Sequence, residues 1–194
     1  MNLVKLSVRD SINELTSKIA KNEDIVIFVY ADEKVIGHGI YEDLFDKQYC
    51  IDNNIAMLNA NFPGGACVVF EGDINFLAYE HGHSELGKKI TQKVNEFLHT
   101  KNINSEIIGN DIVIIENDIY YKVGSYASAW MNNDEGTETV MHISMSVDND
   151  LIDIICKKFR EKQPKGLNDY GITAKEIIDY LNENMEEFEG KLKF

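Results

Sequence analysis

The sequence has no long hydrophobic run and no N-terminal export signal. None of its apolar stretches approaches the roughly 18 residues that a helix needs to cross a bilayer. The N-terminus has neither an apolar core nor a small-residue cleavage site, so it does not read as a signal peptide. We therefore expect a cytoplasmic protein, with residues 1–194 forming a single domain and no separate C-terminal accessory domain.

Cysteine and proline are also scarce. The three cysteines, Cys50, Cys67 and Cys156, cannot form a complete set of disulfides, and none belongs to a Cys-x-x-Cys pair. Since no histidine or cysteine lies beside them at ligand spacing, a structural zinc site is excluded. The pattern predicts buried, reduced thiols. Both prolines, Pro63 and Pro164, fall in expected loops.

Positively charged residues are also few. The chain has 33 acidic and 19 basic residues and a formal net charge of −14. Nucleic acids and anionic membranes are polyanions and would be repelled by such a chain. The charge therefore argues against both as partners.

The hydrophobic pattern that is present predicts a mixed α+β domain. Hydrophobic residues make up 44% of the sequence, as in folded globular proteins. The patterning predicts helices over 11–22, 43–53, 83–101 and 149–162, and a last helix opening with a capping box at Thr173 and Glu176. It predicts strands over 24–31, 34–40, 55–58, 66–70, 74–79, 106–109, 111–115, 119–123, 125–131 and 137–147. We expect a largely antiparallel sheet with flanking helices, packed mainly on one side.

A glycine turn near residue 64 is central to the functional question. Two apolar runs flank Pro63-Gly64-Gly65, which predicts a strand, a tight turn and a second strand. Since glycine has no Cβ, a ligand can lie directly against the backbone there. The sequence leaves open whether the turn is an ordinary hairpin or a ligand cradle.

Several short strings, in their order, resemble the lipoate-protein ligase family, part of the wider group that includes biotin-protein ligases and lipoyl transferases. The resemblance covers most of the chain. The strings are Tyr49 to Leu58, Pro63-Gly64-Gly65-Ala66, Gly72-Asp73-Ile74-Asn75, Gly109 to Val113, Lys122-Val123-Gly124-Ser125-Tyr126-Ala127, Val147-Asp148, and Lys165-Gly166-Leu167 followed by Thr173.

The resemblance implies a fold, a reaction and site residues. It implies the catalytic-domain fold shared with class II aminoacyl-tRNA synthetases, and formation of an acyl-adenylate from lipoate and ATP, with Mg²⁺. The acyl group would then pass to a lysine of a lipoyl carrier domain. Lipoate or lipoyl-AMP would be the ligand, and no protein metal site is expected. The implied residues are Lys122 as catalytic, Gly64, Gly65, Asn75, Asn110 and Asp111 at the acyl-adenylate, and His142 at the acceptor entrance.

The sequence departs from the family pattern where charge is expected. The family's arginine pair falls on Asn59 and Ala60, and its His-Asp on Val69 and Phe70. Losing the arginines removes charge-assisted contacts of roughly 1.5–3 kcal/mol each. Two functions therefore remain open: a ligase-like enzyme, or a ligase-like fold that serves as a ligand-binding or protein-interaction module.

Each candidate also has a structural interpretation. Lys122 could be a surface lysine of a hairpin strand, and His142 a satisfied core histidine. Asn75, Asn110 and Asp111 could cap turns. Cys67 closely follows the glycine turn, which suggests a thioester mechanism. However, it has no histidine close in sequence, and the alternative is a buried thiol.

Overall fold

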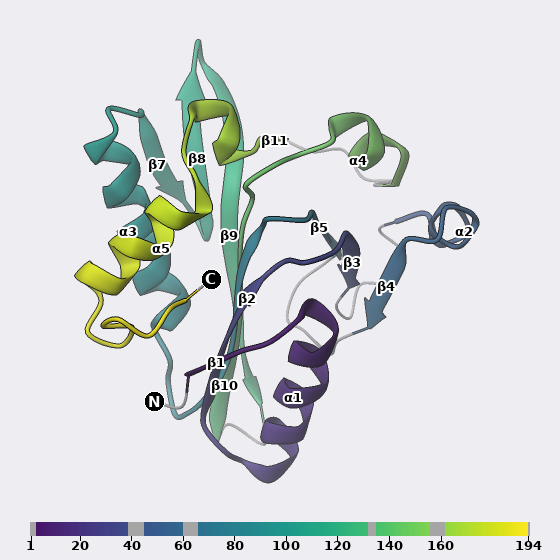
Figure 1. Ribbon diagram of the computed structural model, residues 1–194, viewed down its shortest axis with the longest axis vertical. Coiled ribbons are helices and arrows are strands. Elements are labelled where there is room, and N and C mark those ends of the chain that lie inside the picture. The colour runs from purple at the N-terminus through teal and green to yellow at the C-terminus, as the bar shows by residue number, and fades with distance from the viewer. Residues whose placement is uncertain (1–2, 39–44, 60–65, 132–134, 156–161, 194) are drawn as a thin grey trace.

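The computed structural model describes residues 3–38, 45–59, 66–131, 135–155 and 162–193. Within these ranges the chain forms two sheets and flanking helices (Figure 1). None of the described helices is both long and apolar enough to span a membrane.

The larger sheet forms the centre of the fold. Its strand order is β1-β2-β6-β10-β9-β8-β7. Only β1 pairs in parallel along this path, with β2, and β11 adds a short parallel pairing to β9. The strands are β1 (Leu3–Lys5), β2 (Ile25–Tyr30), β6 (Ile74–His81), β7 (Ser105–Ile108), β8 (Asp111–Glu116), β9 (Ile119–Met131), β10 (Gly136–Ile143) and β11 (Gln163–Pro164). The prediction of a largely antiparallel sheet is confirmed.

The smaller sheet corrects one sequence-based expectation. It contains β3 (Val35–His38), β4 (Ala56–Asn59) and β5 (Ala66–Val69), in the order β4-β3-β5. β3 pairs in parallel with β4 and antiparallel with β5. Of the two interpretations of the glycine turn, the ordinary hairpin is therefore wrong, because β3 lies between β4 and β5.

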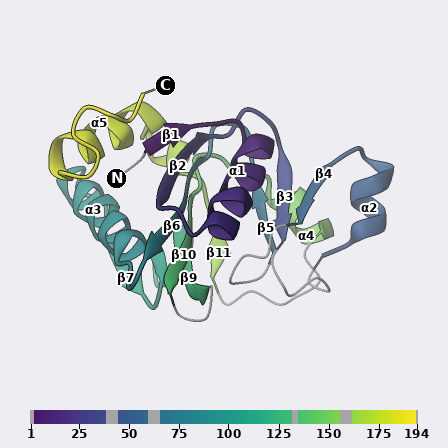
Figure 2. The same cartoon turned by 90° about the horizontal axis from the view of Figure 1, so that it is seen from below.

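Helices cover both faces of the large sheet. Figures 1 and 2 show α3 (Leu86–Thr100) and α5 (Ala174–Asn184) together on one side, and α1 (Val8–Lys21) on the other. Alternate residues of β2 serve the two cores: Val26 and Phe28 pack with α3 and α5, while Ile25 and Ile27 pack with α1. The expectation of helices mainly on one side is therefore incomplete, because both faces of β2 are apolar and each needs a cover.

The remaining helices are short. They are α2 (Lys47–Asp52), α4 (Asn149–Ile155) and a 3₁₀ turn, η2 (Leu167–Tyr170). Residues 156–161, which the sequence assigns to the helix over 149–162, lie outside the described residues. The capping box at Thr173 is present, since its hydroxyl and the Glu176 carboxylate each accept a backbone N–H of the other residue.

A bulge interrupts the pairing of β8 with β9. Ile112 pairs with Gly124, but Val113 pairs with Lys122, so Val123 is the extra residue on β9. A bulge changes which face of the sheet the following side chains point to. Lys122 consequently shares a face with Ser125, three positions later, which the strict alternation of a regular strand would forbid.

Candidate functional site

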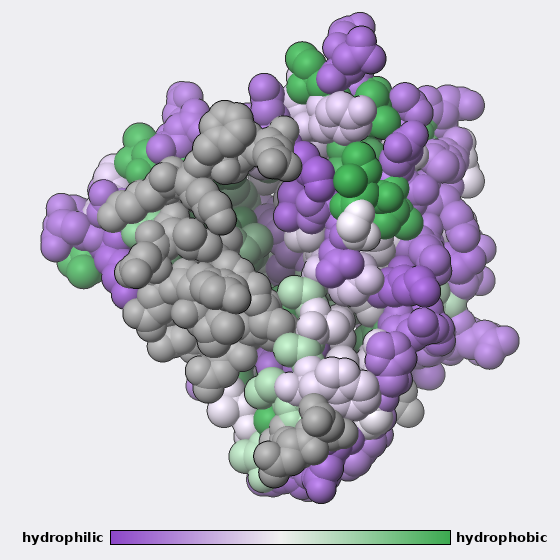
Figure 3. Space-filling view, turned by 180° about the vertical axis from the view of Figure 1, so that it is seen from behind, coloured by the Kyte–Doolittle hydropathy of each residue, from purple (hydrophilic) through white to green (hydrophobic). Residues whose placement is uncertain are grey.

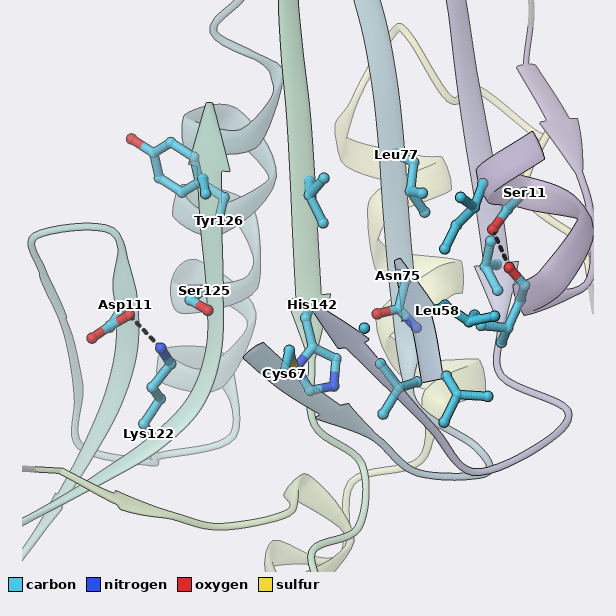
Figure 4. Close-up of a pocket in the computed structure, with 18 residues that line it drawn as sticks. Ser11, Leu58, Cys67, Asn75, Leu77, Asp111, Lys122, Ser125, Tyr126 and His142 are labelled. Atoms are coloured by element: carbon cyan, nitrogen blue, oxygen red, sulfur yellow. Dashed lines mark hydrogen bonds and ion pairs between the residues drawn. The ribbon is translucent and has the colours of Figure 1, made fainter. Parts of the chain in front are cut away.

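A cavity of about 330 Å³ lies between the large sheet, α1 and the small sheet. Side chains from β6, β8, β9 and β10 form its sheet side, and residues of α1, β3, β4 and β5 line the other sides (Figure 4). The volume is at the lower end of the roughly 300–1,000 Å³ that small-molecule sites occupy.

A row of polar residues crosses the sheet at one level of the cavity. Strand pairing places Asp111 opposite Ser125, Ser125 opposite His142, and His142 opposite Asn75. All four line the cavity. The row comes from β8, β9, β10 and β6, so residues distant in sequence form one continuous polar strip.

The next row on the same face is apolar. Two residues further along each strand, Val140 lies between Ala127 and Leu77, and all three line the cavity. Val8 and Ile12 of α1 contribute to the opposite wall. The cavity is thus polar along one row and apolar along the next, which suits a ligand with a polar head and a hydrocarbon tail.

Lys122 reaches the polar row through an ion pair with Asp111. The Lys122 ammonium lies 2.8 Å from Asp111 Oδ1, and Lys162 Nζ lies 2.6 Å from Oδ2 of the same carboxylate. Burial favours a raised pKa for Asp111, but the two lysines outweigh it and the pKa is lowered. Asp111 therefore stays ionised and fixes the position of Lys122.

Cys67, His142 and Asp73 form a hydrogen-bonded chain at the polar row. Cys67 Sγ lies 3.1 Å from His142 Nδ1, and His142 Nε2 lies 2.8 Å from Asp73 Oδ2. The cysteine comes from β5, and His142 comes from β10 (Figure 4). Cys67 and His142 line the cavity, while Asp73 is fully buried behind the histidine.

The ionisation of this pair departs from that of free side chains. Burial works to raise the pKa of the Cys67 thiol, but the charge and hydrogen bond of His142 and the charge of Lys122 outweigh it, and the pKa is lowered. Burial works to lower the pKa of His142, yet the facing thiolate and Asp73 raise it. Both shifts favour a thiolate facing an imidazolium.

Asn75 brings an unused hydrogen-bond donor to the cavity. The residue is only 7% exposed, and its buried side-chain Nδ2 has no hydrogen-bond partner among the described residues. A buried amide without a partner costs about 1–3 kcal/mol. A ligand group that accepts this hydrogen bond would recover that free energy.

The structure brings only part of the predicted site together. Lys122, Asn75, Asp111 and His142 line the cavity, whereas Asn110 is exposed in the turn before β8 and does not. The glycine pair at 64–65 lies outside the described residues.

Two further side chains differ from what their sequence context suggested. Trp130, whose residue type suits the core or the wall of an apolar slot, instead stacks on His83 at the surface. Sequence reasoning found no partner for Cys67 because His142, its partner in the fold, is 75 positions away.

The described residues offer no ready protein metal site. Within the ranges that the structure covers, no group of three or more His, Cys, Asp or Glu side chains is arranged to hold a metal ion. The polar row instead offers one carboxylate, which is paired with two lysines, one hydroxyl, one histidine and one amide.

Similar folds occur among solved structures. A bipartite lipoate protein ligase from Thermoplasma acidophilum superposes with a TM-score of 0.74 at 16% identity, covering 97% of this chain and 83% of that one. The chain has the lipoate-protein ligase fold. A lipoate-protein ligase A structure with bound ATP matches equally well, at 15% identity over 97% of this chain and 85% of that one.

A third structure with the lipoate-protein ligase fold, a P. falciparum protein in complex with lipoate, has a TM-score of 0.74 at 13% identity. It is longer, since this chain covers 62% of it. No protein-family model and no curated protein matches the chain. The resemblance in short sequence strings thus extends to the whole fold. At identities of 13–16%, the similarity establishes the fold and not the activity.

Proposed function

We propose that the chain binds a lipoate-like acyl group in this cavity and transfers it to a lysine amine of a carrier domain. The acyl tail lies along the apolar row at Val140, and the carbonyl lies at the polar row beside Lys122. The lysine ammonium would stabilise negative charge on the carbonyl oxygen during attack.

The unpartnered amide of Asn75 carries this proposal. Asn75 lines the cavity, and its buried Nδ2 has no hydrogen-bond partner among the described residues. A carboxyl or acyl head group at the polar row would accept from Asn75 or, nearer β9, from Lys122, while its tail replaces water against Val140 and Leu77. Proteins with this fold have been solved with lipoate bound, which supports a ligand of that kind.

ATP fits this set of residues less well. A triphosphate needs several cationic or metal contacts. Lys122 and Lys162 share one carboxylate, and Asn59 stands where the family has an arginine. The described residues therefore give poor support for a polyphosphate. The proposal requires only an activated acyl donor, of which lipoyl-AMP is one.

Calorimetric titration with lipoate, lipoyl-AMP and MgATP tests the proposal. We expect micromolar binding of the two acyl ligands and much weaker binding of MgATP. Ala127→Phe fills the apolar row and should weaken acyl binding at least tenfold. Ser128→Phe adds similar bulk at the next, exposed position, with loss of the Ser128–Thr139 hydrogen bond, and serves as the control. A folded protein that binds neither acyl ligand would contradict the proposal.

A second function, ligand binding without transfer, is favoured by the loss of the arginine pair at Asn59 and Ala60. Incubation with lipoyl-AMP and a lipoyl domain separates the two functions. Acyl transfer that Lys122→Ala abolishes supports the enzyme, whereas tight binding without transfer supports the module. Lys175→Ala, at an exposed lysine of α5, is the control for loss of a lysine.

A further inference from the structure

Cys67 is a thiol that lies beside a histidine at the wall of the cavity. It is only partly buried, and its Sγ lies 3.1 Å from His142 Nδ1. We propose that Cys67 is a modification site, at which a small hydroperoxide converts the thiolate to a sulfenic acid and thereby closes the cavity to acyl ligands. The oxidation needs no acyl chemistry, whereas its effect on acyl binding rests on the proposed function.

Asp73 fixes the ring of the histidine beside the sulfur. Its Oδ1 accepts the backbone N–H of Met145 at 2.7 Å, and its Oδ2 accepts the backbone N–H of Phe70 at 2.8 Å. Oδ2 also lies 2.8 Å from His142 Nε2, which donates a hydrogen bond to it. The other ring nitrogen, Nδ1, therefore faces Cys67, where it can hold or release a proton.

The charged groups that face Cys67 favour the thiolate. His142 from β10 and Lys122 from β9 stabilise negative charge on the sulfur, while Asp73 opposes it from behind the imidazole. Asp111, the carboxylate of the polar row, is paired with Lys122 and with a second lysine. Because oxidation follows thiolate character and access, this arrangement selects Cys67.

A second observation points to an oxygen-bearing ligand at this place. Asn75 lies opposite His142 in the sheet and lines the same cavity (Figure 4). Its buried Nδ2 has no hydrogen-bond partner among the described residues. The amide can donate to a peroxide oxygen and, after the reaction, to the oxygen on the sulfur.

The other described cysteine has a different environment. Cys50 is fully buried and packs with Ile36 and Phe45 in another apolar cluster. It therefore offers neither an accessible target for a peroxide nor a thiol at the cavity that could form a disulfide with Cys67. The expected product at Cys67 is a sulfenic acid, which thiols can reduce.

The step balances with the hydroperoxide as the oxidant. The Cys67 thiolate attacks one peroxide oxygen, an S–O bond forms and the O–O bond breaks. The departing oxygen takes the proton of the His142 imidazolium and leaves as water or an alcohol. The sulfur loses two electrons and the peroxide gains them. A small thiol then restores Cys67 through a mixed disulfide.

The added oxygen would occupy the polar row, where the proposed function places the acyl carbonyl. A sulfenic acid there can hydrogen-bond to His142 or Asn75, and it takes up the space and a donor that the acyl head group needs. We expect acyl affinity to fall at least tenfold on oxidation and to return on reduction.

Labelling of the full chain with dimedone, which traps sulfenic acids, tests the modification. Hydrogen peroxide is the probe, and peptide mapping locates the adduct. We expect one adduct, on Cys67, that is absent from Cys67→Ser. A thiol with the ordinary pKa of about 8.5 is only a few per cent ionised at about pH 7, so Cys67 should react at least tenfold faster than N-acetylcysteine.

A variant of the histidine tests how the thiol is activated. His142→Gln cannot carry the positive charge and should slow labelling at least tenfold, while Lys175→Ala, at an exposed lysine of α5, should match the wild type. If His142→Gln does not fold, the wild type decides alone, because labelling no faster than that of N-acetylcysteine overturns the inference. An adduct confined to Cys50 or Cys156 also overturns it.

Calorimetry with lipoate separates this inference from the proposed function. Binding is measured before oxidation, after peroxide and after reduction, with each reagent removed first. If the chain binds lipoate but forms no adduct, or binds equally well when Cys67 is oxidised, the inference fails and the proposed function stands. An adduct on a folded chain that never binds lipoate supports the oxidation site and contradicts the proposed function.

Discussion

At the scale of single residues, Glu138 carries an uncompensated carboxyl group. It lies two positions before Val140 on the same face of β10, is 2% exposed, and its Oε2 has no hydrogen-bond partner among the described residues. Burial raises the pKa of Glu138 to about 7. The folded protein therefore keeps this proton at a pH where the unfolded chain, with a pKa of 4.5, has released it.

Stability should consequently fall as the pH rises from about 4.5 to about 7, because the folded state binds the extra proton there. Glu138→Gln removes this titration. We expect the variant to gain up to about 3 kcal/mol over the wild type between about pH 5 and about pH 8. Urea unfolding at both pH values measures the difference. The exposed Glu106→Gln is the control, and equal pH dependence in Glu138→Gln and the wild type would refute the prediction.

The residue scale also shows what the sequence could identify of the site. Lys122 lies in a short string that resembles a known family, and His142 lies on a strand where that resemblance implies a histidine; both line the cavity. The link from Cys67 to His142 was not found, because the partners lie on β5 and β10 of different sheets. The sequence shows the type of each side chain, whereas this hydrogen bond depends on how the two sheets pack against each other.

At the scale of elements, Gly87 allows α3 to lie close to the sheet. A Cβ at this position would come within 2.6 Å of Tyr126 Cδ2 and 2.9 Å of Thr139 Cγ2. Helix propensity alone favours alanine over glycine by up to about 1 kcal/mol. Overpacking of a close contact costs typically about 1–3 kcal/mol. Because the contact involves ring atoms near the start of the Tyr126 side chain, we expect the steric cost to prevail.

Gly87→Ala should therefore lower the free energy of unfolding by about 1–2 kcal/mol, measured by urea denaturation. Lys88→Ala changes the next residue of the same helix, whose side chain is exposed, and should alter stability by less than about 0.5 kcal/mol. A Gly87→Ala variant more stable than the wild type would show that α3 can move away from the sheet at little cost.

Among the helices and strands, those with a regular apolar stripe were the ones that the sequence predicted well. The period of the apolar residues located α3, α5 and β2 within a few residues, because each buries a regular stripe. Periodicity divided β9 into two strands, over 119–123 and 125–131, because the bulge at Val123 breaks the alternation on which strand prediction depends. It also could not place β3 between β4 and β5, because pairing order is a tertiary property.

At the scale of the whole molecule, charge is the property that most constrains partners. The net charge of −14 is distributed over a largely hydrophilic surface, as the face in Figure 3 shows for the described residues. Among the described residues, the large hydrophobic side chains that are exposed are Ile51, Ile107, Ile119, Tyr120, Trp130 and Ile154. A carrier domain that docks over the cavity would therefore meet a predominantly acidic protein, and long-range electrostatics would oppose its approach if it were acidic too.

If acyl transfer occurs, its rate with an acidic carrier domain should rise with salt. Raising the ionic strength from about 10 mM to about 100 mM shortens the Debye length from about 30 Å to about 10 Å, which screens the repulsion. We expect a severalfold increase in kcat/KM for the carrier domain, with little change for a neutral amine acceptor used as the control. A fall in kcat/KM would mean that the carrier docks on a local basic site, for which Lys162 and Lys165 beside β9 are the first candidates.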